Sequence, residues 1–381
     1  MRSFYDSIFF NVPHLRFPEF TEEWETKPIN DLAVVIGGGT PDTTVKSYWD
    51  GEIQWFTPSE IGKTKYVDSS LRTITEDGLN NSSAKRLPPN TILLSSRATI
   101  GECSLSLREC ATNQGFQSLV SKKCNVDFLY YLIQTKKKDL IRKSCGSTFL
   151  EISANEVRKI QVSVPSDVEQ QKIAELLSLI DERIATQNKI IEDLKKLKSA
   201  IRKKIFSLLK DEYTKSFEIN QLLDYEQPTA YIVANDEYST DTRLTPVLTA
   251  NKGFILGYTD EKNGIYQKGA CIIFDDFTMD AKYVSFPFKV KSSAIKILTA
   301  KPNVNLRFMF EYLSHWELKS EEHKRHYISE ISPLVIELPS KEKQNIIALL
   351  MTSLNNKLTI EEKAKIRYEV QKGYLLSQMF I

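Results

Sequence analysis

The chain has 381 residues, 41% of them apolar, and its 51 Lys and Arg against 49 Asp and Glu give a formal net charge of +2. This length favours two globular cores, and the charge balance excludes binding to nucleic acid through total charge alone. The five cysteines, Cys103, Cys110, Cys124, Cys145 and Cys271, lack C-x-x-C spacing, which argues against a disulfide framework and a zinc site. With no signal-peptide pattern and no run of eighteen apolar residues, we expect an unsecreted, cytoplasmic protein.

Residues 24–164 predict a first mixed α/β domain. Short apolar runs such as "LAVVIGGG" and "NTILLSS" alternate with turn signals and precede a basic helical stretch, "DFLYYLIQTKKKDLIRK". The run "GGGTP" at 37–41 predicts a flexible turn, because a glycine run without G-x-G-x-x-G is weak evidence for a nucleotide site.

Residues 165–206 predict a long amphipathic helix that follows the strand-like run "IQVSVP" and a Pro-Ser pair. Apolar residues at alternating three- and four-residue steps form the a/d seam of a coiled coil, in which Gln187 is polar. About 40 residues at about 1.5 Å each give a helix roughly 60 Å long. The seam residues that we expect to pair are Ile173, Leu177, Ile180, Ile184, Ile191 and Leu194.

Residues 216–338 repeat the same order of strands, a helix ("LRFMFEYLSHWEL") and a final strand. The stretch from Ala281 to Phe310 has six Lys or Arg residues and no Asp or Glu. On a strand, Lys289 and Lys291 would share one face, where they could contact phosphates.

The sequence of the long helix occurs twice in the chain. A shift of 174 residues aligns 165–206 with 339–380 without a gap and with nine identical positions. The second seam is weaker, because polar residues at Glu361, Lys365 and Lys372 occupy a/d positions. Each helix is too long for an ordinary globular domain, so we expect the two copies to pack on each other. The pairing residues expected in the second copy are Ile347, Met351, Leu354 and Leu358.

Familiar catalytic motifs are missing. The Pro-Pro-aromatic loop of an amino-methyltransferase does not occur, and Gly62-Lys63-Thr64 lacks the first glycine of a P-loop. No [DE]-x-K tripeptide follows Pro41-Asp42 within thirty residues, as a restriction-type nuclease would require. We therefore expect no catalytic residue, no metal and no cofactor on this chain.

Two other features could still carry chemistry. His323 and His326 lack metalloprotease spacing, and their context predicts a solvated helix end. Asp275 and Asp276 follow an apolar strand, where acids often work and turns are equally common. One alternative function is thus a single-chain DNA nuclease or modification enzyme with a divergent metal site at these acids. A coiled-coil scaffold without DNA binding is the other.

The order of the motifs resembles the specificity (S) subunit of type I restriction–modification systems. In the first half these are "VPHLRFPEFTEEWE" (12–25), "GGGTP…WDGEIQWFTPSEI" (37–61), "LLSSRATIGECSL" (93–105) and "VPSDVEQQKIAELLSLIDERI" (164–184). In the second half "YEQPTAYIV", "IIFDDFT" and "FPFKVKSSAIKIL" look like a second recognition domain. The resemblance covers nearly the entire chain.

The resemblance implies two α/β (mixed α+β) target recognition domains in pseudo-twofold tandem, separated by two long antiparallel coiled-coil helices. Each domain would read half of a bipartite, asymmetric double-stranded DNA target. Two methyltransferase (M) subunits carrying S-adenosylmethionine, and a restriction (R) subunit, would be the partners. The expected boundaries are 1–164 and 211–338 for the recognition domains, and 165–210 and 339–381 for the helices.

Polar and basic residues on loops are the expected DNA contacts. Lys and Arg suit phosphate or guanine, Asn and Gln suit adenine edges, and Ser and Thr suit either. In the first domain the candidates are Thr40, Thr57, Ser59, Arg97, Thr99, Asn113 and Gln114. In the second they are Tyr225, Gln227, Thr229, Asn251, Lys252, Lys289 and Lys291.

Overall fold

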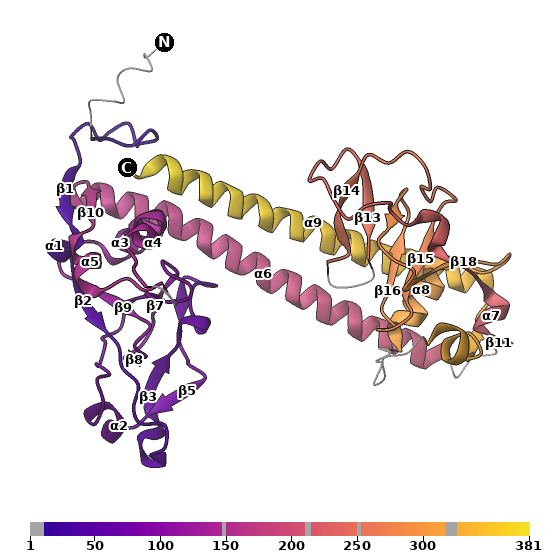
Figure 1. Ribbon diagram of the computed structural model, residues 1–381, viewed down its shortest axis with the longest axis horizontal. Coiled ribbons are helices and arrows are strands. Elements are labelled where there is room, and N and C mark those ends of the chain that lie inside the picture. The colour runs from indigo at the N-terminus through magenta and orange to yellow at the C-terminus, as the bar shows by residue number, and fades with distance from the viewer. Residues whose placement is uncertain (1–10, 147–149, 210–214, 250–252, 317–325) are drawn as a thin grey trace, which may run out of the picture. The chain divides into compact units, whose positions relative to one another are not determined.

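The computed structural model describes residues 11–146, 150–209, 215–249, 253–316 and 326–381 (Figure 1). The chain divides into two compact units: unit 1 comprises 1–189 and 362–381, and unit 2 comprises 190–361. Both units combine helices with mixed sheets, as the sequence predicts. Among the described residues, no helix is long and apolar enough to cross a membrane.

Unit 1 contains a five-stranded sheet, ordered β2-β9-β6-β7-β4, and a three-stranded sheet, β5-β3-β8. Its strands are β1 (Glu25–Pro28), β2 (Ala33–Gly37), β3 (Trp49–Phe56), β4 (Tyr66–Val67), β5 (Arg72–Ile74), β6 (Ile92–Leu94), β7 (Cys103–Ser106), β8 (Cys110–Thr112), β9 (Gln117–Ser121) and β10 (Gln161–Val164). Its shorter helices are α1 (Ile29–Leu32), α2 (Glu76–Asn80), α3 (Val126–Thr135), α4 (Lys137–Arg142) and α5 (Ala154–Lys159).

Unit 2 contains a four-stranded sheet, ordered β12-β18-β15-β16, and a three-stranded sheet, β14-β13-β17. Its strands are β11 (Lys215–Glu218), β12 (Leu223–Glu226), β13 (Thr245–Leu248), β14 (Ile255–Thr259), β15 (Cys271–Asp275), β16 (Ala281–Val284), β17 (Lys289–Val290), β18 (Ile295–Ala300) and β19 (Val335–Leu338). Its shorter helices are α7 (Ile219–Leu222), α8 (Leu306–His315) and a π-helix, η5 (Tyr327–Ile331).

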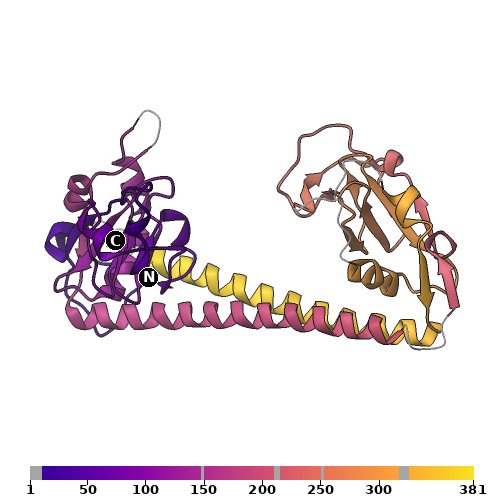
Figure 2. The ribbon, with the colours of Figure 1, turned by 90° about the horizontal axis from the view of Figure 1, so that it is seen from below.

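The two long helices are each unbroken (Figure 2): α6 runs over Asp167–Leu209, 43 residues, and α9 over Lys341–Met379, 39 residues. Each long helix follows an antiparallel strand pair, β1 with β10 before α6 and β11 with β19 before α9. Each pair joins the first and last strands of its domain, and we call it the base of that domain. All the predicted seam residues are buried or half-buried: Ile173, Leu177, Ile180, Ile184, Ile191, Leu194, Ile347, Met351, Leu354 and Leu358.

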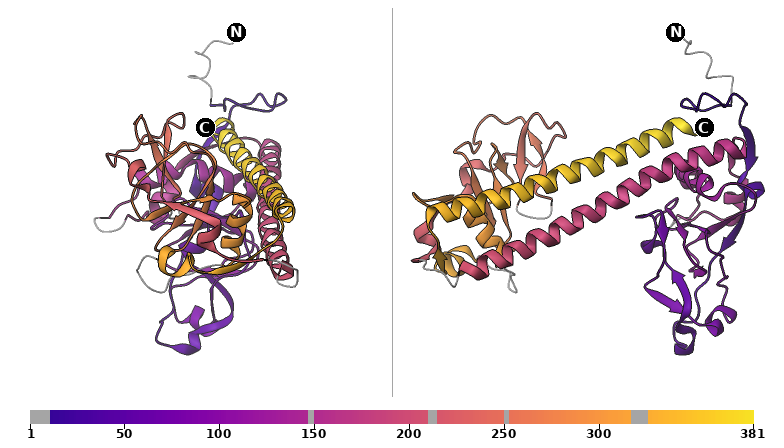
Figure 3. Two further views of the ribbon diagram at one scale, coloured as in Figure 1. Left: turned by 90° about the vertical axis from the view of Figure 1, so that its right-hand side faces the viewer. Right: turned by 180° about the vertical axis from the view of Figure 1, so that it is seen from behind.

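Each unit buries α3 or α8 against one segment from each long helix. In unit 1 the first turns of α6 lie beside the last turns of α9 (Figure 3), where Leu177 and Met379 share a core with Phe128 of α3. In unit 2, Phe206 of α6 and Met351 of α9 share a core with Phe308 of α8. The weak seam of α9 is therefore supplemented by apolar side chains of the domain that it contacts.

One set of hydrogen bonds docks the shorter helix on the long one. In unit 1 the buried Gln170 accepts from the backbone N–H of Asn125 (3.0 Å) and donates to the carbonyl of Pro165 (2.9 Å). Asn125 is also the N-cap of α3, and its side chain accepts from the N–H of Phe128. The same contacts recur in unit 2 at Asn305, Phe308, Pro339 and Gln344.

Candidate functional site

Four loops at the strand ends of unit 1 lie side by side. They are residues 37–41, 57–60, 95–99 and 113–115, which are separated in the sequence but joined by backbone hydrogen bonds. These bonds run from Gly39 to Thr112 (2.9 Å), from Asn113 to Phe56 (3.1 Å) and from Ser96 to Gly115 (2.8 Å). The fold thus gathers the predicted first-domain contacts on one surface, which we call the loop surface.

The glycines of the loop surface allow close packing. A Cβ at Gly38 would lie 2.0 Å from the carbonyl oxygen of Asn113, and one at Gly39 would lie 2.2 Å from Ser83 Oγ. The carbonyl of Gly39 also accepts from the indole of Trp55 (3.0 Å). The prediction of a flexible turn at 37–41 is therefore wrong, because this segment is packed against its neighbours on both sides.

Several predicted contacts on the loop surface already have partners. Arg97 pairs with Glu151 (2.7 Å), and Thr99 donates to Ser95 Oγ (3.1 Å). Ser59 lies 3.1 Å from Thr57, measured between their hydroxyl oxygens. These bonds fix the shape of the loops.

Thr40 and Gln114 are held differently. The Thr40 hydroxyl donates to the amide oxygen of Gln114. Gln114 is exposed, and its amide nitrogen has no hydrogen-bond partner in the part of the chain that the structure describes. Asn113, next to it, uses its side-chain oxygen to accept from the N–H of Gly115 (2.9 Å). Gln114 thus offers a positioned and available donor.

Glu60 is a residue of this surface that sequence reasoning missed. Its carboxylate accepts from the N–H of Thr57 (2.8 Å), from the Thr57 hydroxyl (2.6 Å) and from the N–H of Leu71 (2.6 Å). The T-x-x-E spacing of 57–60 is the signature of a capping box and could have revealed it. Glu60 joins the turn to the chain before β5 and so positions Thr57.

In unit 2 the predicted contacts are less concentrated. Gln227 and Thr229 are exposed at a short 3-10 helix (Pro228–Tyr231), and the chain that follows it bonds to β17 beside the exposed Lys291. Tyr225 lies on β12, 45% exposed, with its ring edge-on to Tyr327. Asn251 and Lys252 lie outside the described residues.

Lys289 does not belong to this surface. Its side chain is buried, and its amine pairs with Glu261 (2.8 Å) and donates to the carbonyl of Asn263 (2.7 Å). Lys289 and the N–H of Ala234 hold the pKa of Glu261 below its usual range. The predicted shared face is wrong, because β17 is only two residues long and Lys291 lies beyond its end, exposed.

The two acids at the end of β15, Asp275 and Asp276, both have partners inside unit 2. Asp275 accepts from the N–H groups of Phe277 (2.8 Å) and Thr278 (3.0 Å) and so closes a turn. Asp276 pairs with Lys296 (3.4 Å) and accepts from the N–H of Tyr327 (2.8 Å). Both acids are buried, which leaves them no open side for a substrate.

The histidine segment also differs from expectation. His323 lies outside the described residues. His326 is 3% exposed, and its ring lies 2.8 Å from the carboxylate of Glu330, so the predicted solvated helix end is wrong at this residue. Within the described ranges, no three His, Cys, Asp or Glu residues come together to hold a metal ion.

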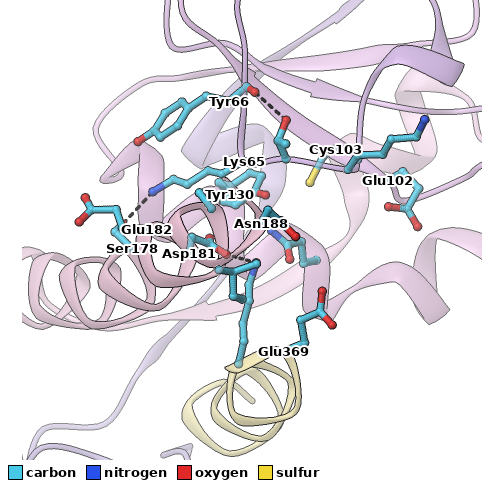
Figure 4. A pocket seen from close by; sticks show the side chains of 17 residues that line it. Lys65, Tyr66, Glu102, Cys103, Tyr130, Ser178, Asp181, Glu182, Asn188 and Glu369 are labelled. Carbon is cyan, nitrogen blue, oxygen red and sulfur yellow. Dashed lines mark hydrogen bonds and ion pairs between the residues drawn. The ribbon is translucent and has the colours of Figure 1, made fainter. Parts of the chain in front are cut away.

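A cavity of about 460 Å³ lies inside unit 1, between residues 62–66, α3 and the two long helices (Figure 4). The amine of the buried Lys65 points to α6, donates to Ser178 Oγ (2.7 Å) and pairs with Asp127 (2.6 Å). Burial raises the pKa of the Cys103 thiol to about 12, so this thiol stays neutral near pH 7 and is a poor nucleophile. The cavity marks a junction between domain and helices.

Comparisons with known proteins agree with this architecture. The model of the type I restriction modification DNA specificity domain matches residues 21–196 and 211–370. The chain is 37% identical over 217 residues to the type I restriction enzyme MjaIX specificity subunit of Methanocaldococcus jannaschii, covering 56% of this chain and 50% of that protein. It is 39% identical over 178 residues to the EcoR124I/EcoR124II specificity subunit of Escherichia coli, covering 42% and 43%.

The chain thus spans about half the length of these two relatives. A solved type I restriction–modification S subunit from M. genitalium has the same fold, with a TM-score of 0.64 and 16% identity over 97% of this chain and 99% of that one. Because the family model matches twice and covers most of the sequence, the chain belongs to the type I restriction modification DNA specificity domain family.

Proposed function

We propose that the chain is a DNA-recognition subunit that reads a bipartite, asymmetric target, one half with each unit. The observation that supports this proposal is that the docking bonds between domain and long helix occur in both units, whereas the exposed loops of the two units differ. Gln170 and Gln344 make the same docking bonds, whereas the loop surface of unit 1 and the exposed residues around Lys291 in unit 2 differ in side chains. Two unlike readers on a repeated frame suit two unlike half-sites.

We further propose that the chain directs methyltransferase and restriction subunits in the cytoplasm and does not itself catalyse. Two methyltransferase subunits would carry S-adenosylmethionine. Helix α9 supports a partner contact, because an exposed apolar row on a helix is typical of an interaction surface. The row contains Ile366, Val370 and Tyr374 in the part of α9 that belongs to unit 1, at four-residue steps and each more than half exposed.

Methylation mapping tests this function. Cells that express the chain with its methyltransferase should gain a two-part methylated motif that is absent without the chain. Exchanging residues 215–338 for the matching domain of a relative should change only one half of the motif. A folded complex with an active methyltransferase but no chain-dependent motif would contradict the proposal.

Replacing Gln114 by alanine is expected to weaken discrimination at a single base pair by about 1–3 kcal/mol, the value of one good base contact. The available amide of Gln114 is the physical reason. The measurement is competition binding of the assembled complex with targets that vary at each position. Gln161→Ala is the matched control, because Gln161 is exposed on β10 in the strand pair at the domain base. Equal effects of the two variants would remove Gln114 from the reading surface.

Lys291→Met and Lys289→Met form a second pair. Loss of a phosphate contact at Lys291 should lower the slope of log affinity against log salt by about 1. Lys289→Met should leave that slope unchanged and cost unit 2 about 1–3 kcal/mol of unfolding free energy, because it removes the partner of Glu261. Salt titrations and urea unfolding measure the two effects. A changed slope for Lys289→Met would contradict the structure.

A further inference from the structure

A buried carboxylate lies at the docking surface of unit 2. Glu311 of α8 is fully buried, and Arg202 of α6 donates to its Oε2 from Nη2 (2.6 Å) and Nε (3.1 Å). Asn355 of α9 donates to the other oxygen, Oε1 (3.3 Å). The Nε of Arg307, on α8 itself, lies 3.6 Å from the same oxygen. A buried carboxylate is costly without a cation, and the cation closest to Glu311 is the arginine that α6 supplies.

Unit 1 makes the equivalent contact, between α3 and the two long helices, with different groups. Tyr131 of α3 is fully buried, and its hydroxyl donates to Asp181 of α6 (2.7 Å). Lys372 of α9 pairs with the other oxygen of Asp181 (2.7 Å). Here the long helices carry the anion and the domain presents a neutral donor, the reverse of unit 2.

The internal repeat places these groups at equivalent positions. Tyr131 and Glu311 each follow an N-cap asparagine, Asn125 or Asn305, by six residues. The 174-residue shift pairs Asp181 with Asn355, Lys198 with Lys372 and Arg202 with Leu376. A lysine thus occupies the equivalent position in both units. The arginine occurs only in unit 2, and the aspartate only in unit 1. The two docking surfaces therefore occupy equivalent positions in the repeat and differ in charge.

We propose that Arg202 and Asn355 in unit 2, and Asp181 and Leu376 in unit 1, determine which recognition domain each pair of helix segments accepts. Unit 2 takes a domain whose contact helix carries a carboxylate at the place of Glu311. Unit 1 takes one with a neutral donor at the place of Tyr131. A domain moved to the other position would leave Arg202 without its anion, or would place Glu311 against Asp181. The inference rests on these contacts and does not depend on DNA reading.

A double-mutant cycle in the full chain tests the first half of the proposal. Arg202→Leu should lower the melting midpoint of unit 2 by about 10 °C, because the buried Glu311 loses the cation closest to its carboxylate. Glu311→Gln should cost less, and the double variant Arg202→Leu/Glu311→Gln should melt well above Arg202→Leu alone. Strictly additive midpoints would overturn the pairing.

Domain exchange tests the selection itself. The strand pairs β1–β10 and β11–β19 give matched boundaries, so residues 215–338 can be replaced by a second copy of 25–164 in the full chain. One chimaera keeps Arg202 and Asn355. The other carries Arg202→Leu and Asn355→Asp, which give its helices the leucine and the aspartate of unit 1.

The sign of the change in melting midpoint tests the proposal. The same pair of substitutions should lower the melting midpoint of the parent chain, where Glu311 then faces an aspartate, and should raise it in the chimaera. Thermal unfolding with limited proteolysis of the exchanged half gives both readouts. A second chimaera that melts no higher than the first, or that fails to fold as the first does, would overturn the proposal.

Discussion

Replacing Lys296 by methionine is expected to cost unit 2 about 3–5 kcal/mol of unfolding free energy, because it leaves a buried carboxylate without its cation. Lys296 and Asp276 are both 1% exposed, and their charged groups lie 3.4 Å apart. The Tyr225 ring, 5.7 Å from the lysine amine, adds a favourable contact that is lost as well. Urea unfolding, monitored by hydrogen exchange within unit 2, measures the change.

The double variant Asp276→Asn/Lys296→Met should recover most of that loss, since an amide oxygen can still accept from the N–H of Tyr327. Lys282→Met on neighbouring β16 is the matched control, because that amine is part-exposed and should change stability by less than about 0.5 kcal/mol. The same variants judge the nuclease alternative. Metal-dependent DNA cleavage by the purified chain that disappears in the stability-matched double variant Asp276→Asn/Lys296→Met and persists in Lys282→Met would favour that alternative.

Replacing Gln344 by leucine is expected to destabilise unit 2 by about 2–4 kcal/mol, because one buried and one part-buried backbone group lose their partners. These groups are the N–H of Asn305 and the carbonyl of Pro339, each bonded at 2.9 Å. Gln170→Leu should do the same to unit 1 through Asn125 and its partners. Hydrogen exchange resolved by peptide shows which unit opens.

The two glutamines are each other's control. Each variant should raise exchange in its own unit and leave the other unit unchanged, because the two sets of bonds are separate. Gln171→Leu, at the exposed neighbouring position, should cost far less, since it removes only exposed bonds, one with Asn125 and one with Glu175. A Gln344 variant that opened unit 1 as strongly as unit 2 would contradict this division of the chain.

The repeat and the long helices could be predicted because their signal is local and periodic. Heptad spacing places Ile173 and Ile347 in a buried seam, and the expected spans 165–210 and 339–381 compare with the observed Asp167–Leu209 and Lys341–Met379. A helix of this length has many seam positions, so a few polar residues do not hide its period.

Side-chain surroundings could not be predicted in the same way. Lys289 and Lys291 look alike in sequence, and only the fold brings Glu261 to one of them. Glu311 reads as a solvated helix position, because its partner Arg202 is 109 residues away. Whether a charged side chain is buried and paired depends on which distant segment of the chain packs against it. A single sequence does not show that packing.

The division of the chain also sets the order in which it can fold during synthesis. Unit 2 is continuous from 190 to 361, whereas the core of unit 1 needs Leu375, Met379 and Phe380 beside Trp24 and Phe128. At about 5–20 residues per second, the ribosome takes roughly 10–35 s to make residues 190–361 before those side chains emerge. During that interval Phe128, Leu177 and their neighbours stay partly uncovered, a nascent apolar surface suited to a chaperone. The core of unit 1, whose first part is translated before unit 2, is therefore completed after it.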